Sequence, residues 1–403
     1  MKQQRRSFLK QAGQAAALVP ILSLGPRSVL GANDRVRMGG IGVGDRGTDR
    51  LKTAQRLGAD VVVLCDVNQL MLDRAGAVCG GSVERMEDHR QLLERKDIDA
   101  VVIAPPDHWH HDIFLDAIRA GKDVYIEKPL SKTIAEGESM VQAAQQSNQV
   151  VQVGNHRRSG THWHAARQAI QDGMIGEIKW VRSYDCRDFS QGDPYQLRSR
   201  DPNLYNPEKI NWKHFLGNAP DRPYTPERAS AWRWYWDYAG GLLTDIGAHN
   251  NDVAMWMSDC LDVRSVTANG GNYFFDFWET PDVVHATFDC RRFSIDFTVQ
   301  FINGHDGYGH SIYGTKGCIV QQYPDNVVYL YSQGDRRKPV VKWEMNDEGT
   351  AHMQNFLDCV KSRKPTNSPI ATAHKIITAC HLSNLAYRQE TKVKWDGEQA
   401  QVG

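Results

Sequence analysis

The feature that most constrains this chain is a glycine-rich turn directly after a short apolar strand, V-R-M-G-G-I-G-V-G-D-R-G at residues 36–47. A run with helical spacing follows the last glycine, and a second apolar strand at 61–64 leads to Asp66. That acid lies roughly 20 residues beyond the glycines, as in dinucleotide-binding units. Strand, glycine turn, helix and acid in this order predict such a unit, whereas the three glycines alone would also suit a turn in another α/β protein.

The glycines of this turn have separate expected roles. Gly42 allows the tight turn, Gly44 lets backbone N–H groups approach a pyrophosphate, and Gly47 lets the helix pack close to the strand. The positive end of the helix then faces the phosphates, and we count Arg46 among the cofactor-binding residues. Asp66 is expected to accept hydrogen bonds from a ribose diol and to repel a 2′-phosphate, so NAD is favoured over NADP.

Strands and helices alternate as far as residue 155, which predicts a doubly wound parallel sheet, the Rossmann arrangement. One buried strand runs into P-P-D-H-W-H-H at 105–111, and another ends in E-K-P at 127–129. Ligands of such sheets bind at the carboxyl ends of the strands. We therefore expect these two turns to contribute cofactor-binding residues, namely Pro105, His108, Glu127 and Lys128.

The second half has a different pattern. Several strand candidates follow residue 263 with short turns and no helices between them, so we expect an α+β domain with an open, mostly antiparallel sheet. Residues 185–230 show little periodicity and predict a long ordered loop over the site. We divide the 403 residues into a signal peptide at 1–32, an NAD(P)-binding Rossmann domain at 33–155 and a substrate-binding and oligomerisation domain at 156–403.

The first residues, M-K-Q-Q-R-R-S-F-L-K, resemble a twin-arginine export signal. The apolar run at 15–24 is too short for a membrane span. We therefore expect export of the folded protein to the periplasm or cell envelope of a bacterium. The alternative is a basic tail without a targeting function.

Composition excludes some classes of protein. Lys plus Arg equals Asp plus Glu, at 48 each, so no charge excess indicates a nucleic-acid or anionic-membrane partner. The eight cysteines are scattered without a C-x-x-C pair, which argues against a zinc ribbon or a dense disulfide network.

A second chemical signature lies in the stretch 231–252, A-W-R-W-Y-W-D-Y-A-G-G-L-L-T-D-I-G-A-H-N-N-D. His249 falls inside an apolar helical stripe, so it should be at least partly buried and neutral, as a proton acceptor requires. Asp245 lies one helical turn earlier and either orients this histidine or binds a substrate hydroxyl. Lys128 reaches the same cleft from the first half, where its ammonium would polarise an oxygen that loses its proton.

Together, the glycine turn, P-P-D-H-W-H-H, E-K-P and the later D-x-x-x-H resemble the Gfo/Idh/MocA oxidoreductases. The resemblance implies hydride transfer with a nicotinamide cofactor, catalysed by Lys128, Asp245 and His249. It also implies a second domain whose open sheet forms a homodimer or homotetramer. The turn Asn155-His156-Arg157-Arg158 is similar to the family's substrate-facing turn.

We expect a sugar or polyol substrate to contact Asn155, Arg157, Arg158, Trp163 and Trp234, the arginines by hydrogen bonds and the tryptophans by stacking. A surface ion pair and an interdomain core are the alternative explanations for these two residue types. Two histidine-rich patches, 108–111 and 156–164, lack a metal-ligand spacing, so no metal site is predicted.

The sequence thus predicts an NAD-dependent oxidoreductase acting on a sugar or polyol, with a cofactor that stays bound. One alternative is an NAD-dependent glycoside hydrolase or lyase, which oxidises the sugar transiently and eliminates its leaving group. Another is a nucleotide-bound sensor without catalysis.

Overall fold

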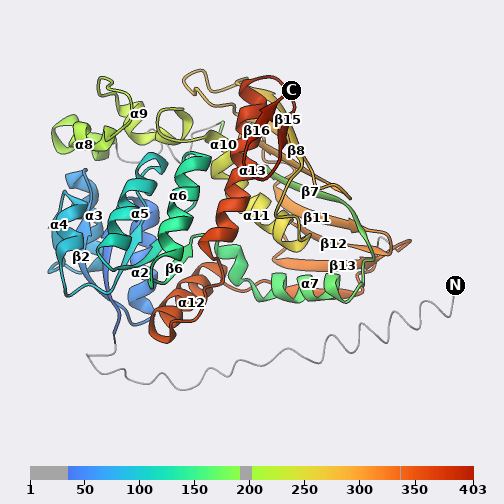
Figure 1. Cartoon of the computed structure of the whole chain (residues 1–403), viewed down its shortest axis with the longest axis horizontal. Coiled ribbons are helices and arrows are strands. Elements are labelled where there is room, and N and C mark those ends of the chain that lie inside the picture. The colour runs from blue at the N-terminus through green and yellow to red at the C-terminus, as the bar shows by residue number, and fades with distance from the viewer. Residues whose placement is uncertain (1–34, 191–201, 336) are drawn as a thin grey trace.

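The computed structural model describes residues 35–190, 202–335 and 337–403, and these build two sheets side by side (Figure 1). The first sheet has six strands in the order β3-β2-β1-β4-β5-β6, all parallel, which confirms the predicted doubly wound arrangement. Its strands are β1 (Arg37–Ile41), β2 (Asp60–Cys65), β3 (Glu84–Met86), β4 (Ala100–Ile103), β5 (Asp123–Ile126) and β6 (Val151–Val153).

Helices cover both faces of this sheet because its strands are apolar on both sides. In β4, Val101 and Ile103 belong to one hydrophobic cluster, whereas Ala100 and Val102 belong to another. Such burial on both faces explains why the strand reads as a continuous apolar run. The covering helices are α2 (Asp45–Arg56), α3 (Gln69–Cys79), α4 (His89–Glu94), α5 (His110–Arg119) and α6 (Ile134–Gln145).

The second sheet is mostly antiparallel, as predicted, with the order β14-β13-β12-β11-β7-β10-β9-β8-β15-β16. The exception is β7, which pairs parallel with β10. Its strands are β7 (Ile178–Cys186), β8 (Ser265–Gly271), β9 (Val283–Asp289), β10 (Ser294–Gln300), β11 (Tyr308–Gly314), β12 (Gly317–Gln322), β13 (Val327–Ser332), β14 (Val341–Glu344), β15 (Val393–Trp395) and β16 (Ala400–Val402).

Short helical elements connect the sheets and surround the region between them. The stretch predicted as one long loop contains several of these elements, and its residues 191–201 lie outside the described part. The elements are η2 (Asp107–Trp109), η3 (His156–Ser159), α7 (Thr161–Gln171), η5 (Pro202–Tyr205), η6 (Pro207–Lys209), α8 (Trp212–Leu216), α9 (Pro226–Ser230), η7 (Trp232–Trp234), α10 (Gly241–Asp245) and α11 (Gly247–Met257).

The last two helices, α12 (Glu348–Ser362) and α13 (Ile370–Arg388), pack back onto the nucleotide half. Figure 1 shows α13 running between the two sheets and α12 below it. Met353 and Phe356 of α12 share a hydrophobic cluster with β1 and β2, and His352 is hydrogen-bonded to the carbonyl of Val153 at 2.9 Å. The C-terminal helices therefore fix the two halves relative to each other, which sequence periodicity alone does not predict.

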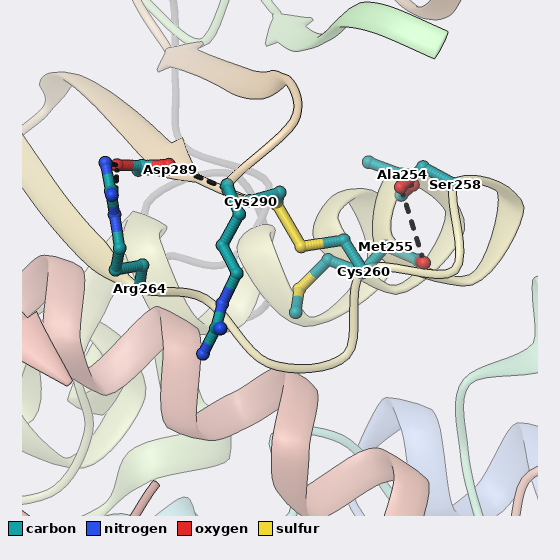
Figure 2. The surroundings of a disulfide bond; sticks show 8 residues. Ala254, Met255, Ser258, Cys260, Arg264, Asp289 and Cys290 are labelled. Atoms are coloured by element: carbon teal, nitrogen blue, oxygen red, sulfur yellow. Dashed lines mark hydrogen bonds and ion pairs between the residues drawn. A yellow bond between two sulfur atoms is a disulfide. The ribbon is translucent and has the colours of Figure 1, made fainter. Parts of the chain in front are cut away.

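One disulfide joins Cys260, just after α11, to Cys290, just after β9 (Figure 2). The remaining six cysteines form no disulfide, and five of them are buried. No helix in the described part of the chain is long and apolar enough to cross a membrane. The predicted twin-arginine signal lies in residues 1–34, outside the described residues.

Candidate functional site

A cavity of about 1020 Å³ lies between the two halves and is lined by residues of both. It collects the carboxyl ends of β1, β2, β4 and β5, where ligands of doubly wound sheets bind. Of the residues predicted for the site, the following line this cavity: Gly42, Gly44, Arg46, Asp66, Pro105, Glu127, Lys128, Arg157, Trp163, Asp245 and His249.

The glycine turn has the geometry of a phosphate-binding loop. Gly42 has φ of +77°, and a Cβ there would lie 2.3 Å from the backbone nitrogen of Pro105, so only glycine fits. A Cβ at Gly47 would lie 2.0 Å from the Gly42 carbonyl oxygen, which explains why helix and strand approach so closely. Around Gly44, by contrast, no protein atom lies within 4 Å of an added Cβ, and the backbone at this helix start is open to a ligand.

Asp66 stands at the end of β2 with both carboxylate oxygens held by the backbone. The N–H of Val43 donates to Oδ2 at 2.8 Å, and the N–H of Asn68 donates to Oδ1 at 2.9 Å. Burial raises the pKa of Asp66 to about 6, although these N–H donors oppose the shift. The carboxylate therefore ties the glycine turn to β2, and its remaining lone pairs suit a ribose diol.

Lys128 and Asp245 form a buried ion pair across the cavity. The Lys128 ammonium donates to Asp245 Oδ1 at 2.6 Å and to the Asp245 carbonyl oxygen at 3.0 Å. Burial alone would raise the pKa of Asp245, but the charges of Lys128 and Arg233 lower it below its usual value. Arg233 lies beside the same carboxylate, with Nε 3.5 Å from Oδ1. A substrate oxygen near Lys128 would therefore meet a fixed positive charge.

His249 lines the same cavity from α11, with its ring inclined by 65° to that of His156 at 4.9 Å between centroids. Burial, reinforced by the ammonium of Lys128, lowers the pKa of His249 well below its ordinary value, so the imidazole is neutral near pH 7. Within the described residues, its Nδ1 has no hydrogen-bond partner. The expected helix is interrupted at Ile246 between α10 and α11, and the Asp245 side chain turns to Lys128.

Asp107 is a buried carboxyl on the same cavity that was not among the predicted site residues. It follows β4 in η2, is 3% exposed, and its Oδ1 has no hydrogen-bond partner in the described part of the chain. Burial and the nearby Asp245 carboxylate raise the pKa of Asp107 to about 7, against the opposing charges of Arg233, Lys128 and Lys132. An unpaired buried carboxyl in a cavity is a candidate functional group. Only the P-P-D-H-W-H-H turn signalled it, through its place after a strand.

Further cations line the cavity wall from the second half. Arg157 donates to Asn250 Oδ1 at 2.8 Å and contacts His310 Nε2 at the same distance. Arg187 donates to Asp185 Oδ2 at 2.6 Å from the end of β7. Residues of α11 and of the second sheet therefore hold these arginines at the cavity wall.

Three of the predicted substrate residues are not on the cavity wall, which corrects that prediction. Trp234 is fully buried in the core and stacks on Trp278 at 3.8 Å between ring centroids. Arg158 is buried in an ion pair with Asp252 at 2.7 Å, and the side-chain amide of Asn155 donates to a backbone carbonyl. Arg158 and Asn155 are thus bonded to residues of α11, and Trp234 packs within the core. Trp163 does line the cavity, and its indole N–H donates to Glu348 at 3.1 Å.

His108 is likewise not a cavity residue. Its Nε2 is hydrogen-bonded to the Phe215 carbonyl at 2.8 Å, and burial lowers its pKa to about 4. It therefore attaches the turn after β4 to the second half, which corrects its expected contact with the cofactor. Gly47 acts through packing, behind the loop. Among the described residues, no three His, Cys, Asp or Glu side chains come together as metal ligands.

Two family models match the chain. The model described as the oxidoreductase family with an NAD-binding Rossmann fold matches residues 36–155, and the GFO/IDH/MocA C-terminal domain matches residues 163–320. An alpha-N-acetylgalactosaminidase of Shewanella oneidensis is 28% identical over 206 residues, and a glycosyl hydrolase family 109 protein of Shewanella pealeana is 30% identical over 207 residues. These matches span 44% and 45% of the two relatives, and 43% and 44% of this chain.

Solved structures with the same fold cover most of the chain. Levoglucosan dehydrogenase in complex with NADH and levoglucosan aligns with a TM-score of 0.71 at 20% identity, over 89% of this chain and 99% of its own. An NAD-binding oxidoreductase from Klebsiella pneumoniae aligns with the same score and identity over 90% of this chain and 99% of its own. The family match and the NADH-bound neighbours agree on NAD as the cofactor.

The contrast between two glycines predicts separate effects. Gly44→Val should fold normally, because the added side chain meets no neighbouring protein atom within 4 Å of its Cβ. It should bind NAD at least about tenfold more weakly, because the side chain occupies the space through which the pyrophosphate approaches the backbone. Gly42→Ala should instead lower the free energy of unfolding by roughly 1–3 kcal/mol, because its Cβ meets backbone atoms at positive φ.

Titration with NAD followed by fluorescence, together with urea unfolding, measures both effects. If Gly44→Val bound NAD as tightly as the unaltered protein, the assignment of this loop to the phosphates would be wrong.

Proposed function

This chain belongs to the Gfo/Idh/MocA oxidoreductase family, and we propose that it transfers a hydride between a hydroxyl-bearing carbon of a sugar or polyol and a tightly bound nicotinamide. The observation that carries the proposal is the Lys128–Asp245 pair, which shares one cavity with a neutral His249 and the glycine turn. NAD supplies the hydride acceptor when bound. The chain itself must bind the substrate, orient it and accept the proton of the reacting hydroxyl.

The residues divide this work according to their charge. When a substrate hydroxyl carbon gives up hydride, its oxygen must also lose a proton, and negative charge develops there. The Lys128 ammonium, fixed by Asp245 at 2.6 Å, stabilises that charge. His249 lines the cavity with a neutral imidazole, so this ring accepts the proton. Arg157 is held on the cavity wall by Asn250 and His310, where its guanidinium would bind the remaining substrate hydroxyls. The buried Trp163 lines the same part of the wall.

The sugar class of substrate draws support from the aromatic and hydroxyl-binding residues on the wall. Levoglucosan dehydrogenase, which shares the fold, acts on a sugar, and a dehydrogenase from Bordetella pertussis was solved with NADH and UDP-GlcNAcA. These two structures share only the fold with this chain, so a sugar as its substrate is part of the proposal. The cavity, at about 1020 Å³, has room for a sugar beside a dinucleotide.

Lys128→Met should lower kcat for sugar oxidation by roughly 10²-fold or more, because the developing oxyanion loses its ammonium and Asp245 loses its partner. Formation of NADH absorbance across a panel of sugars and polyols measures the effect. Lys132→Met is the matched control, because that ammonium donates to the Asp237 carbonyl at 2.7 Å and does not line the cavity.

Equal activity of Lys128→Met and Lys132→Met would contradict the proposed role. Intact NAD binding without turnover of any sugar in the unaltered protein would instead favour a nucleotide-bound sensor.

A second candidate function is NAD-dependent glycoside hydrolysis or lysis, and Asp107 is the observation that favours it. Transient oxidation next to a C–H bond acidifies that bond, and elimination then needs a group that protonates the leaving oxygen. Asp107 lies on the cavity with a pKa raised to about 7, so it can hold a proton near neutral pH. The relatives named as glycosyl hydrolases add support to this candidate.

Asp107→Asn distinguishes the two candidates by pH. If Asp107 is the acid, release of an aglycone from an aryl glycoside falls as pH rises through about 7, where the carboxyl loses its proton. The variant should lose that pH limb and be slower by roughly 10²-fold, whereas single-turnover NADH formation should change by less than about threefold.

An unchanged pH profile of aglycone release in Asp107→Asn would show that Asp107 is not the acid that protonates the leaving oxygen. Net NADH accumulation without aglycone release would favour the simple oxidoreductase.

Export by the twin-arginine route remains part of the proposal. Arg5 and Arg6 carry the signal in the sequence, and the Cys260–Cys290 disulfide supports residence in an oxidising compartment. An envelope space without a pool of NAD would favour a cofactor that stays bound through each cycle. Folded export would allow the cofactor to be loaded beforehand.

Replacing Arg5 and Arg6 together by lysine should retain the protein in the cytoplasm, because the charge is kept and only the paired arginines are lost. Cell fractionation of a bacterium expressing both versions measures the distribution. An equal distribution of the two versions between fractions would contradict export by this route.

A further inference from the structure

We propose that residues 203–218, here called the strap, form part of the NAD site by covering its adenosine end and retaining the cofactor through turnover. The inference rests on the proposed use of NAD and goes beyond it by assigning the retention to a segment of the second half. The strap contains most of η5, all of η6 and α8, and the residues that join them. Figure 1 shows α8 above the helices of the nucleotide half.

One end of the strap is bonded to the loop that follows Asp66. The side-chain amide of Asn68 donates to the Leu204 carbonyl at 2.7 Å, and the backbone N–H of Asn211 donates to the Val67 carbonyl at 2.9 Å. Asn68 is held in place because its own Oδ1 caps α3 by accepting from Leu70 N–H. The strap therefore contacts the two residues that immediately follow the predicted ribose-binding carboxylate.

The other end is bonded to the turn after β4. His108 Nε2 and the indole N–H of Trp109 both lie 2.8 Å from the carbonyl oxygen of Phe215. Gly217 has φ of +54° and packs against the Trp109 ring, where a Cβ would lie 2.5 Å from the ring. These anchors make the strap cross from the end of β2 to the turn after β4, over the edge where the dinucleotide binds.

The inner side of the strap forms part of the cavity wall. Asp66, Met71 and Arg74 line the adenosine end from the nucleotide half. The strap adds apolar and aromatic residues and one imidazole, surfaces on which a purine can stack. They are Leu204, Tyr205, Ile210, His214 and Phe215.

Retention follows from where the anchors lie. A dinucleotide bound between the glycine turn and the strap is covered on its outer side by the strap. Its adenosine end can therefore dissociate only after the strap detaches from the nucleotide half. Detachment breaks the hydrogen bonds at Asn68, Asn211, His108 and Trp109 together. The strap thus supplies the slow dissociation that a redox cycle without cofactor exchange needs.

Asn211 offers a matched pair of variants for the test. Its φ of −75° suits proline, and Ile210 before it is extended, so Asn211→Pro fits the backbone and removes the N–H that donates to Val67. Asn211→Ala loses the same side chain and keeps that N–H. A difference between the two variants therefore reports the anchor itself.

The experiment uses the full purified chain loaded with NADH. Excess NAD is added, and the loss of bound-NADH fluorescence gives the dissociation rate, while gel filtration followed by absorbance gives the NADH retained per chain. We expect Asn211→Pro to dissociate at least about tenfold faster than Asn211→Ala. Equal NADH dissociation rates of the two variants would contradict the proposal that the strap retains the cofactor.

A second variant keeps the proposal testable if Asn211→Pro does not fold. Gly217→Ala leaves the first anchor intact and pushes α8 away from Trp109, so it should also speed dissociation. Should both retain NADH like the unaltered protein, the strap is not the retaining element although NAD use stands. If the unaltered protein binds no NAD at all, the proposed function fails, and the strap proposal fails with it.

Discussion

The ion pair between Lys128 and Asp245 is the interaction on which the site depends. Lys128 follows a strand of the nucleotide half, Asp245 ends a helix of the second half, and both are nearly buried. Removing either partner would leave a charge without compensation in a low dielectric, which is costly. The pair therefore needs the two halves in one fixed arrangement, and in return it presents an ammonium at the point where both halves meet.

The charges of this pair give the neighbouring titratable groups different protonation states. The ammonium helps to keep His249 neutral and lowers the pKa of Asp245, while the Asp245 carboxylate helps to raise the pKa of Asp107. One cavity thus holds a fixed cation, an uncharged imidazole and a carboxyl that titrates near neutral pH. Groups whose protonation states are pushed apart in this way can divide proton donation and acceptance between them.

The arrangement of the halves is maintained by segments far from the catalytic residues in sequence. Helix α12 packs Met353 and Phe356 onto the nucleotide sheet, and His352 reaches the end of β6. The strap bonds back to the loop after Asp66 and to the turn after β4. The second half therefore supports the nucleotide half on more than one side, although neither contact has a local sequence pattern.

The sequence by itself determined the alternation of elements and the position of the glycine turn, because the glycine spacing and the apolar run at 100–103 are patterns of neighbouring residues along the chain. It also placed Lys128, Asp245 and His249 as candidates for one site. Only the tertiary structure decided which side chains meet: Asp245 pairs with Lys128 rather than His249, Trp234 is core, and Arg158 pairs with Asp252. The spacing of residues along a helix determines which side chains share one face of it. The partner that each side chain meets depends on which distant chain segments pack against that face.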